Sequence, residues 1–163
     1  MLTRQLIQAN FMSSKIILSL ALASALTGCA SVNMASKEES SKAKAFNPPN
    51  KGHAAVYIYR NSNFGGSSKK DIFINEKCLG ESVANVFFYT ELEGNKTHRI
   101  ETESEFSPNG IDLPTQPDAT YFVRQYIKMG AFVPGANLEI VSEAQGKADI
   151  TPLEMAQPGQ CGG

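Results

Sequence analysis

Three glutamates occupy alternate positions in the segment RIETESE, and paired carboxylates are the groups with which many hydrolases work. In a β-strand, Glu101, Glu103 and Glu105 would share one face at steps of about 6.6 Å. Such a pair could act as general acid and base, but a glycosidase also needs a deep cleft, for which a small domain has little room. We therefore expect a solvated or ion-paired face, and keep a ligand or partner surface and catalysis as alternatives.

A second charged pattern lies in the segment YFVRQYIKM, residues 121–129. In a strand, Arg124 and Lys128 would share a face with Phe122 and Tyr126. If this strand were next to the glutamate strand, opposite charges would form a ladder across the two. The candidate partner surface thus consists of Glu101, Glu103, Glu105, Arg124, Tyr126 and Lys128.

Other residues that carry chemistry form no recognisable pattern. His53 and His98 are far apart in the sequence, whereas zinc ligands cluster, so we predict no metal site. The glycine-rich segment 63–67 lacks the Lys-Ser/Thr ending and the following helix of a phosphate loop. Serine, histidine and aspartate all occur, but without a nucleophile-elbow pattern. The sequence therefore predicts no cofactor and no enzymatic activity.

The N-terminus has the pattern of a secretory signal. Ile16 to Leu26 is an apolar stretch of 11 residues, whereas a membrane-spanning helix needs about 20. Lys15 precedes the stretch and small residues follow it, as in an export signal. Translation could begin at Met1 or at Met12, and the second start gives a more compact signal.

The end of this signal, Leu26-Thr27-Gly28-Cys29, resembles the lipobox of bacterial lipoproteins. In such proteins the cysteine thiol receives a diacylglyceryl group, the signal is cut before the cysteine, and the new amine is usually acylated. Two or more acyl chains give a stable anchor where one gives reversible binding. The residue after the cysteine is Ala30, and in Gram-negative lipoproteins a residue other than aspartate there implies the outer membrane, facing the periplasm. The alternative is a secreted protein with a chance cysteine.

Composition and charge narrow the choice of partners. The chain has 19% charged and 42% hydrophobic residues, which is ordinary for a globular protein. The 16 acidic residues outnumber the 15 basic ones, so there is no basic excess for nucleic acid. We expect the membrane, through Cys29, as one partner, an envelope protein or peptidoglycan as another, and no nucleic acid.

Four regions follow from these patterns: a signal peptide over 1–28, a lipidated cysteine with a disordered tether over 29–50, a folded domain over 51–156 and a tail over 157–163. The tether prediction rests on Ser, Ala, Lys, Glu and Pro, and a flexible segment of this length spans about 25 Å. The domain is expected to be all-β, a small antiparallel β-sandwich of seven to eight strands. Its expected elements are strands at 55–60, 71–75, 78–79, 85–92, 97–105, 111–113, 121–129 and 138–142, and a short helix within 143–156 broken by Gly146 and Pro152.

The segments AAVYIYRNSNFGGS, DIFINEKCLGE, FFYTELEGNKTHRIETESEFSP and YFVRQYIKMGAFVPGANLEIV resemble a family of bacterial lipoproteins known as domain-of-unknown-function family 2846. The resemblance is collinear from about Ala54 to Ser142. It implies a small β-sandwich like those of peptide-binding accessory domains, and no established activity, cofactor or catalytic residue. The chain departs from the family at Glu93–His98, where the turn glycine Gly94 remains.

The two remaining cysteines form an even pair in an exported, oxidising setting. We predict a disulfide between Cys78 and Cys161, which would tie the tail to the sheet and cover an edge. The alternative is a buried free Cys78 with a flexible Cys161.

Three functions remain for comparison. The first is a membrane-anchored envelope module that binds or supports partners without chemistry, and it is the one we predict. The second is an envelope hydrolase, and the third is a carrier of a small apolar ligand between the sheets. A carrier would need a cavity among Val56, Ile58, Phe88, Ile100, Val123 and Ile127.

Overall fold

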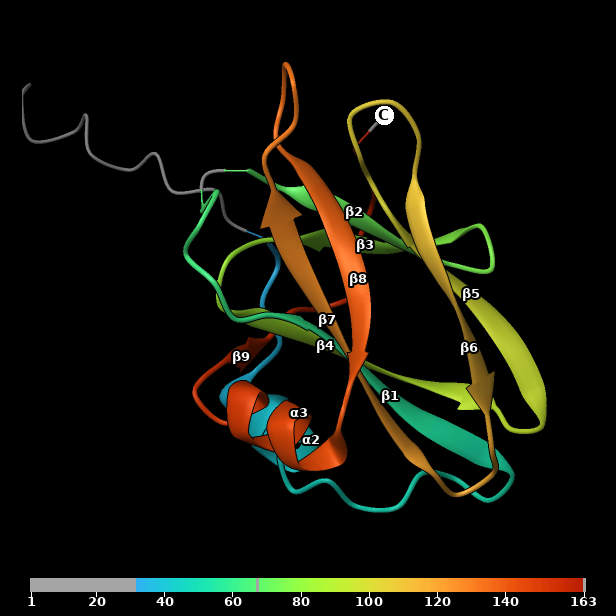
Figure 1. Cartoon of the computed structure of the whole chain (residues 1–163). Coiled ribbons are helices and arrows are strands. Elements are labelled where there is room, and N and C mark those ends of the chain that lie inside the picture. The colour runs from blue at the N-terminus through green and yellow to red at the C-terminus, as the bar shows by residue number, and fades with distance from the viewer. Residues whose placement is uncertain (1–31, 67, 163) are drawn as a thin grey trace, which may run out of the picture.

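The computed structural model describes residues 32–66 and 68–162, so the predicted signal and Cys29 lie outside the described residues. Within this part of the chain, nine strands and two helices alternate with turns (Figure 1). The strands are β1 (His53–Arg60), β2 (Lys70–Ile74), β3 (Lys77–Ser82), β4 (Val86–Glu93), β5 (Lys96–Thr102), β6 (Asn109–Thr115), β7 (Thr120–Lys128), β8 (Gly135–Val141) and β9 (Glu154–Met155). The helices are α2 (Lys37–Ala43) and α3 (Glu143–Ile150).

The strands form two sheets that face each other as a sandwich. One sheet has the order β8-β7-β1-β4-β9 and the other has the order β3-β2-β5-β6. The predicted all-β sandwich is confirmed, but it is not purely antiparallel, because β1 pairs in parallel with β7 and β4 pairs in parallel with β9. The chain crosses between the sheets after β6 and returns beside β1 in the same direction. Alternation along a strand predicts which face is buried, but not which neighbour it takes.

The core between the sheets comes from the alternating apolar residues of the strands. Val56 and Ile58 of β1, Phe88 of β4, Ile100 of β5 and Val123 of β7 belong to one cluster, each at most 2% exposed. Each such side chain contributes about 1.5–3 kcal/mol through burial. Five of the six residues that a carrier would need to line its cavity are therefore packed against one another, and the sixth, Ile127, is 8% exposed.

A chain of buried polar side chains joins the two sheets. Gln125 of β7 donates to the Thr102 hydroxyl of β5 over 2.7 Å and accepts a bond from Ser82 of β3. Thr102 in turn donates to the Asp71 carbonyl of β2 over 2.9 Å. Because an unpaired polar group is costly in a core, this chain favours one alignment of the sheets.

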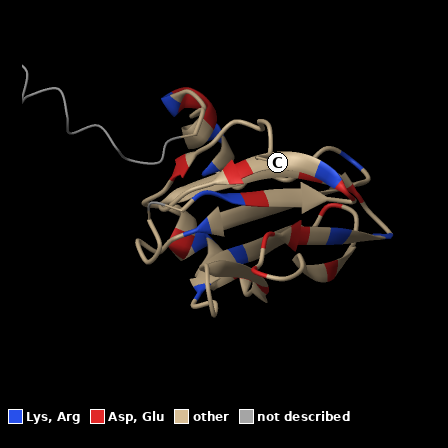
Figure 2. Ribbon diagram, turned by 90° about the horizontal axis from the view of Figure 1, so that it is seen from above, with Lys and Arg blue, Asp and Glu red and all other residues tan. Residues whose placement is uncertain are grey.

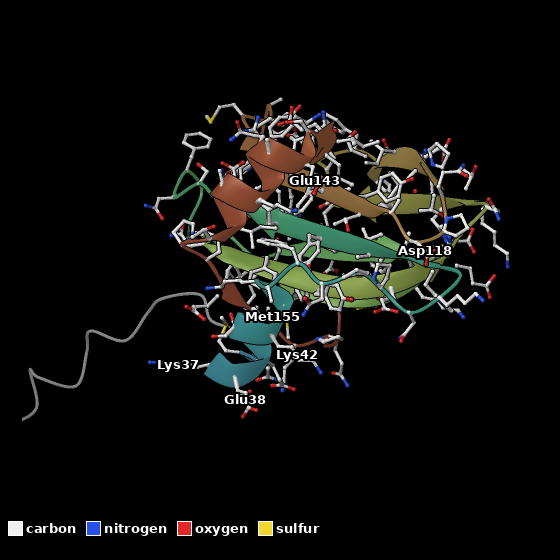
Figure 3. The ribbon with its side chains drawn as sticks, turned by 90° about the horizontal axis from the view of Figure 1, so that it is seen from below. Lys37, Glu38, Lys42, Asp118, Glu143 and Met155 are labelled. Carbon is white, nitrogen blue, oxygen red and sulfur yellow. A yellow bond between two sulfur atoms is a disulfide. The ribbon has the colours of Figure 1, made fainter. Side chains whose placement is uncertain are left out.

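The outer face of the five-stranded sheet is also buried, under the two helices. Tyr57 and Tyr59 of β1, Phe87 of β4 and Phe122 of β7 form a second cluster with Ile150 of α3. Tyr57 stacks on Phe122 with ring centroids 5.1 Å apart. In Figure 3, which is seen from below, α2 and α3 lie apart from each other on this side of the molecule. Strand β1 is thus buried on both faces, although its sequence alternates.

The predicted disordered tether is wrong for residues 32–50. Helix α2 lies within that segment and begins with a capping box, in which the Ser36 hydroxyl and the Glu39 carboxylate each bond the other residue's backbone N–H. The Ala35 N–H also donates to the Met155 carbonyl over 2.9 Å, and Ala43 is buried against the sheet. The polar composition concealed this, because only the few small residues facing the sheet are buried.

Helix α3 differs from its prediction in length and in the role of Gly146. The helix continues through Gly146, and only glycine fits there, because a β-carbon would lie 2.1 Å from a Phe122 ring carbon. The chain then leaves the helix and adds the short strand β9 to the edge of the sheet. Across the described residues, neither helix has the length and apolar character that a membrane span requires.

Candidate functional site

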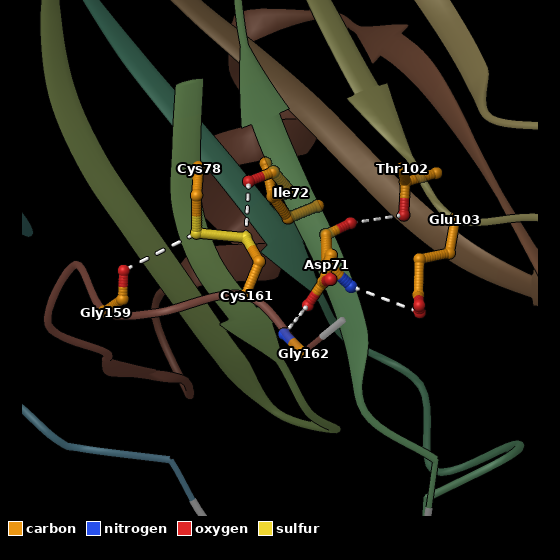
Figure 4. Close-up of a disulfide and its surroundings, with 8 residues drawn as sticks. All are labelled: Asp71, Ile72, Cys78, Thr102, Glu103, Gly159, Cys161 and Gly162. Carbon is orange, nitrogen blue, oxygen red and sulfur yellow. Dashed lines mark hydrogen bonds between the residues drawn. A yellow bond between two sulfur atoms is a disulfide. The ribbon is translucent and has the colours of Figure 1, made fainter. Parts of the chain in front are cut away.

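The predicted disulfide is confirmed. Cys78 and Cys161 are bonded, with α-carbons 5.9 Å apart (Figure 4). The Gly159 N–H donates to the Leu79 carbonyl over 2.9 Å, so the tail runs along β3, which is an edge strand. The Gly162 N–H donates to the Asp71 carboxylate over 3.2 Å. The bond therefore fastens the tail across the edge of the four-stranded sheet, as expected.

The three glutamates do not share one strand face, which corrects the prediction. Strand β5 ends at Thr102, so only Glu101 lies in a strand, where it pairs with Arg99 at 3.6 Å. Glu103 pairs with Lys70 at 3.5 Å, while Glu105 reaches a different loop. The strand ends because the Glu103 carbonyl accepts the Ala136 N–H of β8 over 3.0 Å, which draws the chain toward the opposite sheet.

The expected charge ladder between β5 and β7 is also wrong, because the two strands belong to different sheets. Arg124 instead pairs with Glu139 of the neighbouring strand β8 at 2.5 Å. The Tyr126 hydroxyl accepts a bond from the Asn137 side chain over 3.0 Å, and Lys128 is exposed at the strand end. The predicted alternation of β7 is correct, but the six candidate residues form no single surface. Figure 2 shows acidic and basic residues interspersed along the strands.

The two histidines have positions consistent with structural roles. One ring nitrogen of His98 contacts the Glu93 carbonyl and the other contacts the Asn75 side chain, each over 2.9 Å. His53 opens β1. In residues 32–66 and 68–162, no cluster of three or more His, Cys, Asp or Glu has the arrangement of a metal site.

A cleft of about 400 Å³ lies between α2 and the five-stranded sheet. Tyr57 lines it and donates to the Ala43 carbonyl over 2.8 Å, while Tyr89 donates to Glu91 over 2.7 Å. Burial, and then the charge of Glu91, raise the pKa of Tyr57 to about 12. Partial burial acts to raise the pKa of Glu91, but bonds from Tyr89 and the Asn50 N–H hold it below its usual value. The phenols and the carboxylate that line the cleft are therefore already bonded to groups of the protein.

One end of the sandwich carries the long loops, and we call it the loop end. It comprises the segments 61–66, 83–85, 103–108 and 129–134. The strand registers place them together: Lys70 lies opposite Ser82, Thr102 opposite Asn109, and Lys128 opposite Gly135. In Figure 1 the loops after β5 and β7 project side by side at the top of the view.

Large apolar side chains project from this end into solvent. Phe106 is 79% exposed, Met129 76% and Phe132 86%. We call these three, together with Phe64 and Val133, the apolar tips; the last two are just over half exposed. The sequence reasoning missed them, although the signal was present: aromatic residues lie in the glycine- and proline-containing segments EFSPNG and MGAFVPG, where no strand could bury them.

A carboxylate holds two of these loops together. Glu105 accepts the backbone N–H groups of Ala131 over 2.6 Å, of Val133 over 3.2 Å, and of Phe132 between them. Partial desolvation acts to raise the pKa of Glu105, but these three bonds outweigh it and hold the pKa below 4.5. The apolar tips therefore stand on a cross-linked pair of loops.

A buried guanidinium holds the first loop. Arg60, fully buried at the end of β1, donates to the carbonyls of Phe64 over 3.2 Å, Gly65 over 2.5 Å and Ser68 over 2.8 Å. Burial lowers the pKa of Arg60, yet an arginine stays charged at neutral pH. Bonds from a charged donor are among the stronger ones in proteins, so this residue determines the loop's shape.

The fold defines a small two-sheet β-sandwich with a helical cover and a disulfide-fastened tail. A family model described as "Protein of unknown function (DUF2846)" matches residues 50–136, and the chain belongs to this family. It is 50% identical over 131 residues to an "Uncharacterized protein" of Haemophilus influenzae (strain ATCC 51907 / DSM 11121 / KW20 / Rd), covering 80% of this chain and 77% of that protein. The family resemblance found in the sequence is thus confirmed. No solved structure matches the chain.

Proposed function

We propose that this protein is a bacterial envelope lipoprotein, anchored through Cys29 in the outer membrane and facing the periplasm. Its β-sandwich is a non-catalytic module that binds or supports an envelope partner, protein or peptidoglycan. The observation that carries the proposal is the sequence Leu26-Thr27-Gly28-Cys29, placed where an export signal ends and just before the folded domain begins.

The disulfide supports export. Disulfides form and persist in oxidising compartments such as the bacterial periplasm and are rare in the cytosol. The bond between Cys78 and Cys161 leaves Cys29 as the third and last cysteine of the chain. A single cysteine outside the bridge, at the end of an export signal, is the pattern expected of a lipid attachment site.

A binding module is favoured over a hydrolase by how the candidate polar groups are used. Glu101 pairs with Arg99 of its own strand, Glu103 pairs with Lys70 of β2, and Glu105 accepts backbone bonds from the loop after β7. The phenols of the cleft beside α2 have raised pKa values, which makes Tyr57 a donor rather than a base at neutral pH. The packed core between the sheets likewise favours a binding surface on the exterior over an internal carrier cavity.

The test is lipid labelling of the wild-type chain and of Cys29→Ser in bacteria fed an alkyne fatty acid. We expect label on the wild type, and for Cys29→Ser no label and an unprocessed or soluble form. The matched control is Cys78→Ser with Cys161→Ser, which should keep the label because only the bridge is lost. If Cys29→Ser were still processed and stayed with membranes through salt and carbonate washing, the proposal would be wrong.

A further inference from the structure

The apolar tips form an exposed hydrophobic surface at the loop end of the domain. Such patches on soluble domains mark sites of contact with proteins, ligands or membranes. The three most exposed of the large apolar side chains are those of Phe106, Met129 and Phe132. Aromatic side chains are enriched where proteins meet the membrane–water interface.

The chain enters the fold at this same end. Val32 packs against the core, and the Asn33 carbonyl accepts the Gln157 N–H over 2.8 Å, so both residues are held by the domain. They lie beside Lys69 and Glu81, which pair at 2.8 Å where β2 begins and β3 ends. Those are the strand ends from which the loop end projects.

The connection to the anchor is short. Val32 comes three positions after Cys29, and a fully extended chain of that length spans about 10 Å. A flexible tether reaching to residue 50 would let the domain move freely above the membrane. The docked segment 32–50 removes that freedom and orients the loop end toward the lipid.

We propose that the loop end docks on the bilayer, with Phe106, Met129, Phe132 and Val133 inserted among the lipid headgroups and Phe64 beside them. The proposal rests on the proposed function in one respect, the lipid on Cys29. The occupant is a bilayer rather than a partner protein, because an acyl chain about 10 Å from the domain brings the lipid surface to these residues first.

The Glu105 carboxylate removes one part of the cost of inserting this loop, the part that comes from unpaired backbone donors. A backbone N–H that loses water without gaining a partner costs free energy, and this cost rises in the membrane interface. The N–H groups of Ala131, Phe132 and Val133 already have a partner in Glu105. The loop can therefore leave water without exposing unpaired donors.

Charge contributes less to this docking than apolar insertion, because among the described lysines of the loop end only Lys128 has no ion pair. Lys69 is paired with Glu81 and Lys70 with Glu103, so the cations at the start of β2 are balanced by local carboxylates. Binding driven by apolar insertion is insensitive to salt, whereas binding driven by lysines to anionic lipid is screened. The dependence on salt therefore separates the two mechanisms.

The test uses a tryptophan as a depth reporter, because the natural chain contains none. Phe132→Trp places the reporter on an apolar tip, and Thr97→Trp places it on an exposed site of β5 at the opposite end of the sandwich. Each lipidated protein is reconstituted into vesicles of phosphatidylethanolamine and phosphatidylglycerol. We expect blue-shifted emission and quenching by brominated acyl chains for Phe132→Trp alone, unchanged between low and high salt.

A second arm omits the anchor. The mature chain with Cys29→Ser retains every residue of the described fold, and we expect it to co-float with the same vesicles. Phe106→Ser with Phe132→Ser should weaken this partitioning about tenfold or more, because burial of apolar side chains drives the insertion. Ile140→Ser, half exposed on β8, is the matched control and should have no effect.

The outcomes separate the two proposals. If fatty-acid labelling of Cys29 fails but the Phe132→Trp reporter enters vesicles without an anchor, the lipoprotein proposal is wrong and docking stands. If labelling succeeds but Phe132→Trp and Thr97→Trp are equally quenched by aqueous iodide, docking is overturned. A blue shift that needs high protein concentration and no vesicles would identify a second copy of the chain as the occupant, and would also overturn it.

Discussion

The two ends of the sandwich are built in different ways. The end opposite the loop end, which we call the turn end, contains the short connections 51–52, 75–76, 94–95 and 116–119. Backbone bonds interlock them: the Gly94 N–H donates to the Gly52 carbonyl over 2.9 Å, and the Asp118 N–H to the His53 carbonyl over 2.7 Å. Positive φ angles at Asn75, Glu76, Asn95 and Asp118 give the turns their tightness.

The loop end has longer connections that are held by two charged side chains, Arg60 and Glu105. Each bonds three backbone groups of one loop. The first loop also has turn bonds of its own, such as that from the Gly66 N–H to the Asn63 carbonyl over 2.9 Å, and the loop tips carry apolar residues outward. The turn end is therefore stabilised by backbone bonds between its turns and the loop end by charged side chains that bond loop backbone, and the apolar tips lie at the loop end.

The largest effect expected is loss of the disulfide, which fastens the tail to the edge strand β3. Cys78→Ser with Cys161→Ser opens a bridge with a sequence separation of 83. In the chain-entropy description this costs about 4–5 kcal/mol of unfolding free energy. Urea denaturation of the oxidised protein, of the reduced protein and of the double variant measures it. Equal midpoints for all three would show that the bridge does not stabilise the fold.

The next largest loss of stability is expected at the loop end, from replacing Arg60. Arg60→Met retains the apolar stem but removes the donors of three loop carbonyls, with an expected loss of about 2–3 kcal/mol. Hydrogen exchange should show the damage concentrated at residues 61–66 and the start of β2. Arg124→Met, in a partly exposed ion pair on the same sheet, is the control and should cost about 1 kcal/mol or less. An equal loss for both variants would contradict the special role of Arg60.

A smaller effect is expected at the turn end from Gly94→Ala. The added β-carbon would lie 2.6–2.8 Å from atoms of Pro117, two of them backbone, so the two turns must move apart. The expected loss is about 1–2 kcal/mol, typical of mild overpacking. Gly159→Ala, whose nearest contact would be 4.0 Å away, is the control and should be close to neutral by the same denaturation measurement. A neutral Gly94→Ala would mean that the interlocked turns are not rigid.

The smallest effect on global stability, and the most local one, is expected when Glu105 is protonated or replaced by alanine. Because its pKa is lowered in the fold, its bonds are fully present above the ordinary value of 4.5 and are lost as pH falls through the lower folded value. In NMR spectra, the amide resonances of Ala131, Phe132 and Val133 should shift together in acid, with a midpoint below 4.5. Glu105→Ala should abolish this titration and leave the turn end unchanged. Independent midpoints for the three amides would contradict the shared carboxylate.

Several elements were predictable because their signals are local. The alternation of β1 and β7, the turn residues around Gly94 and the helix near Glu143 each depend on residues close in sequence. The disulfide between Cys78 and Cys161 followed from counting cysteines in an exported chain. The family followed from a collinear series of such local patterns.

What the sequence by itself determined was therefore eight of the nine strands and the cysteine pair, because periodicity and cysteine count belong to the chain alone. Only the tertiary structure decided that β5 and β7 lie in different sheets, which separates Glu101 from Arg124. It also decided that residues 32–50 pack against the domain instead of forming a disordered tether, and that Glu105 bonds the loop between β7 and β8. These three features depend on contacts between residues distant in sequence. The free energy that stabilises such contacts comes from burial and hydrogen bonds that form only when the two sheets pack together.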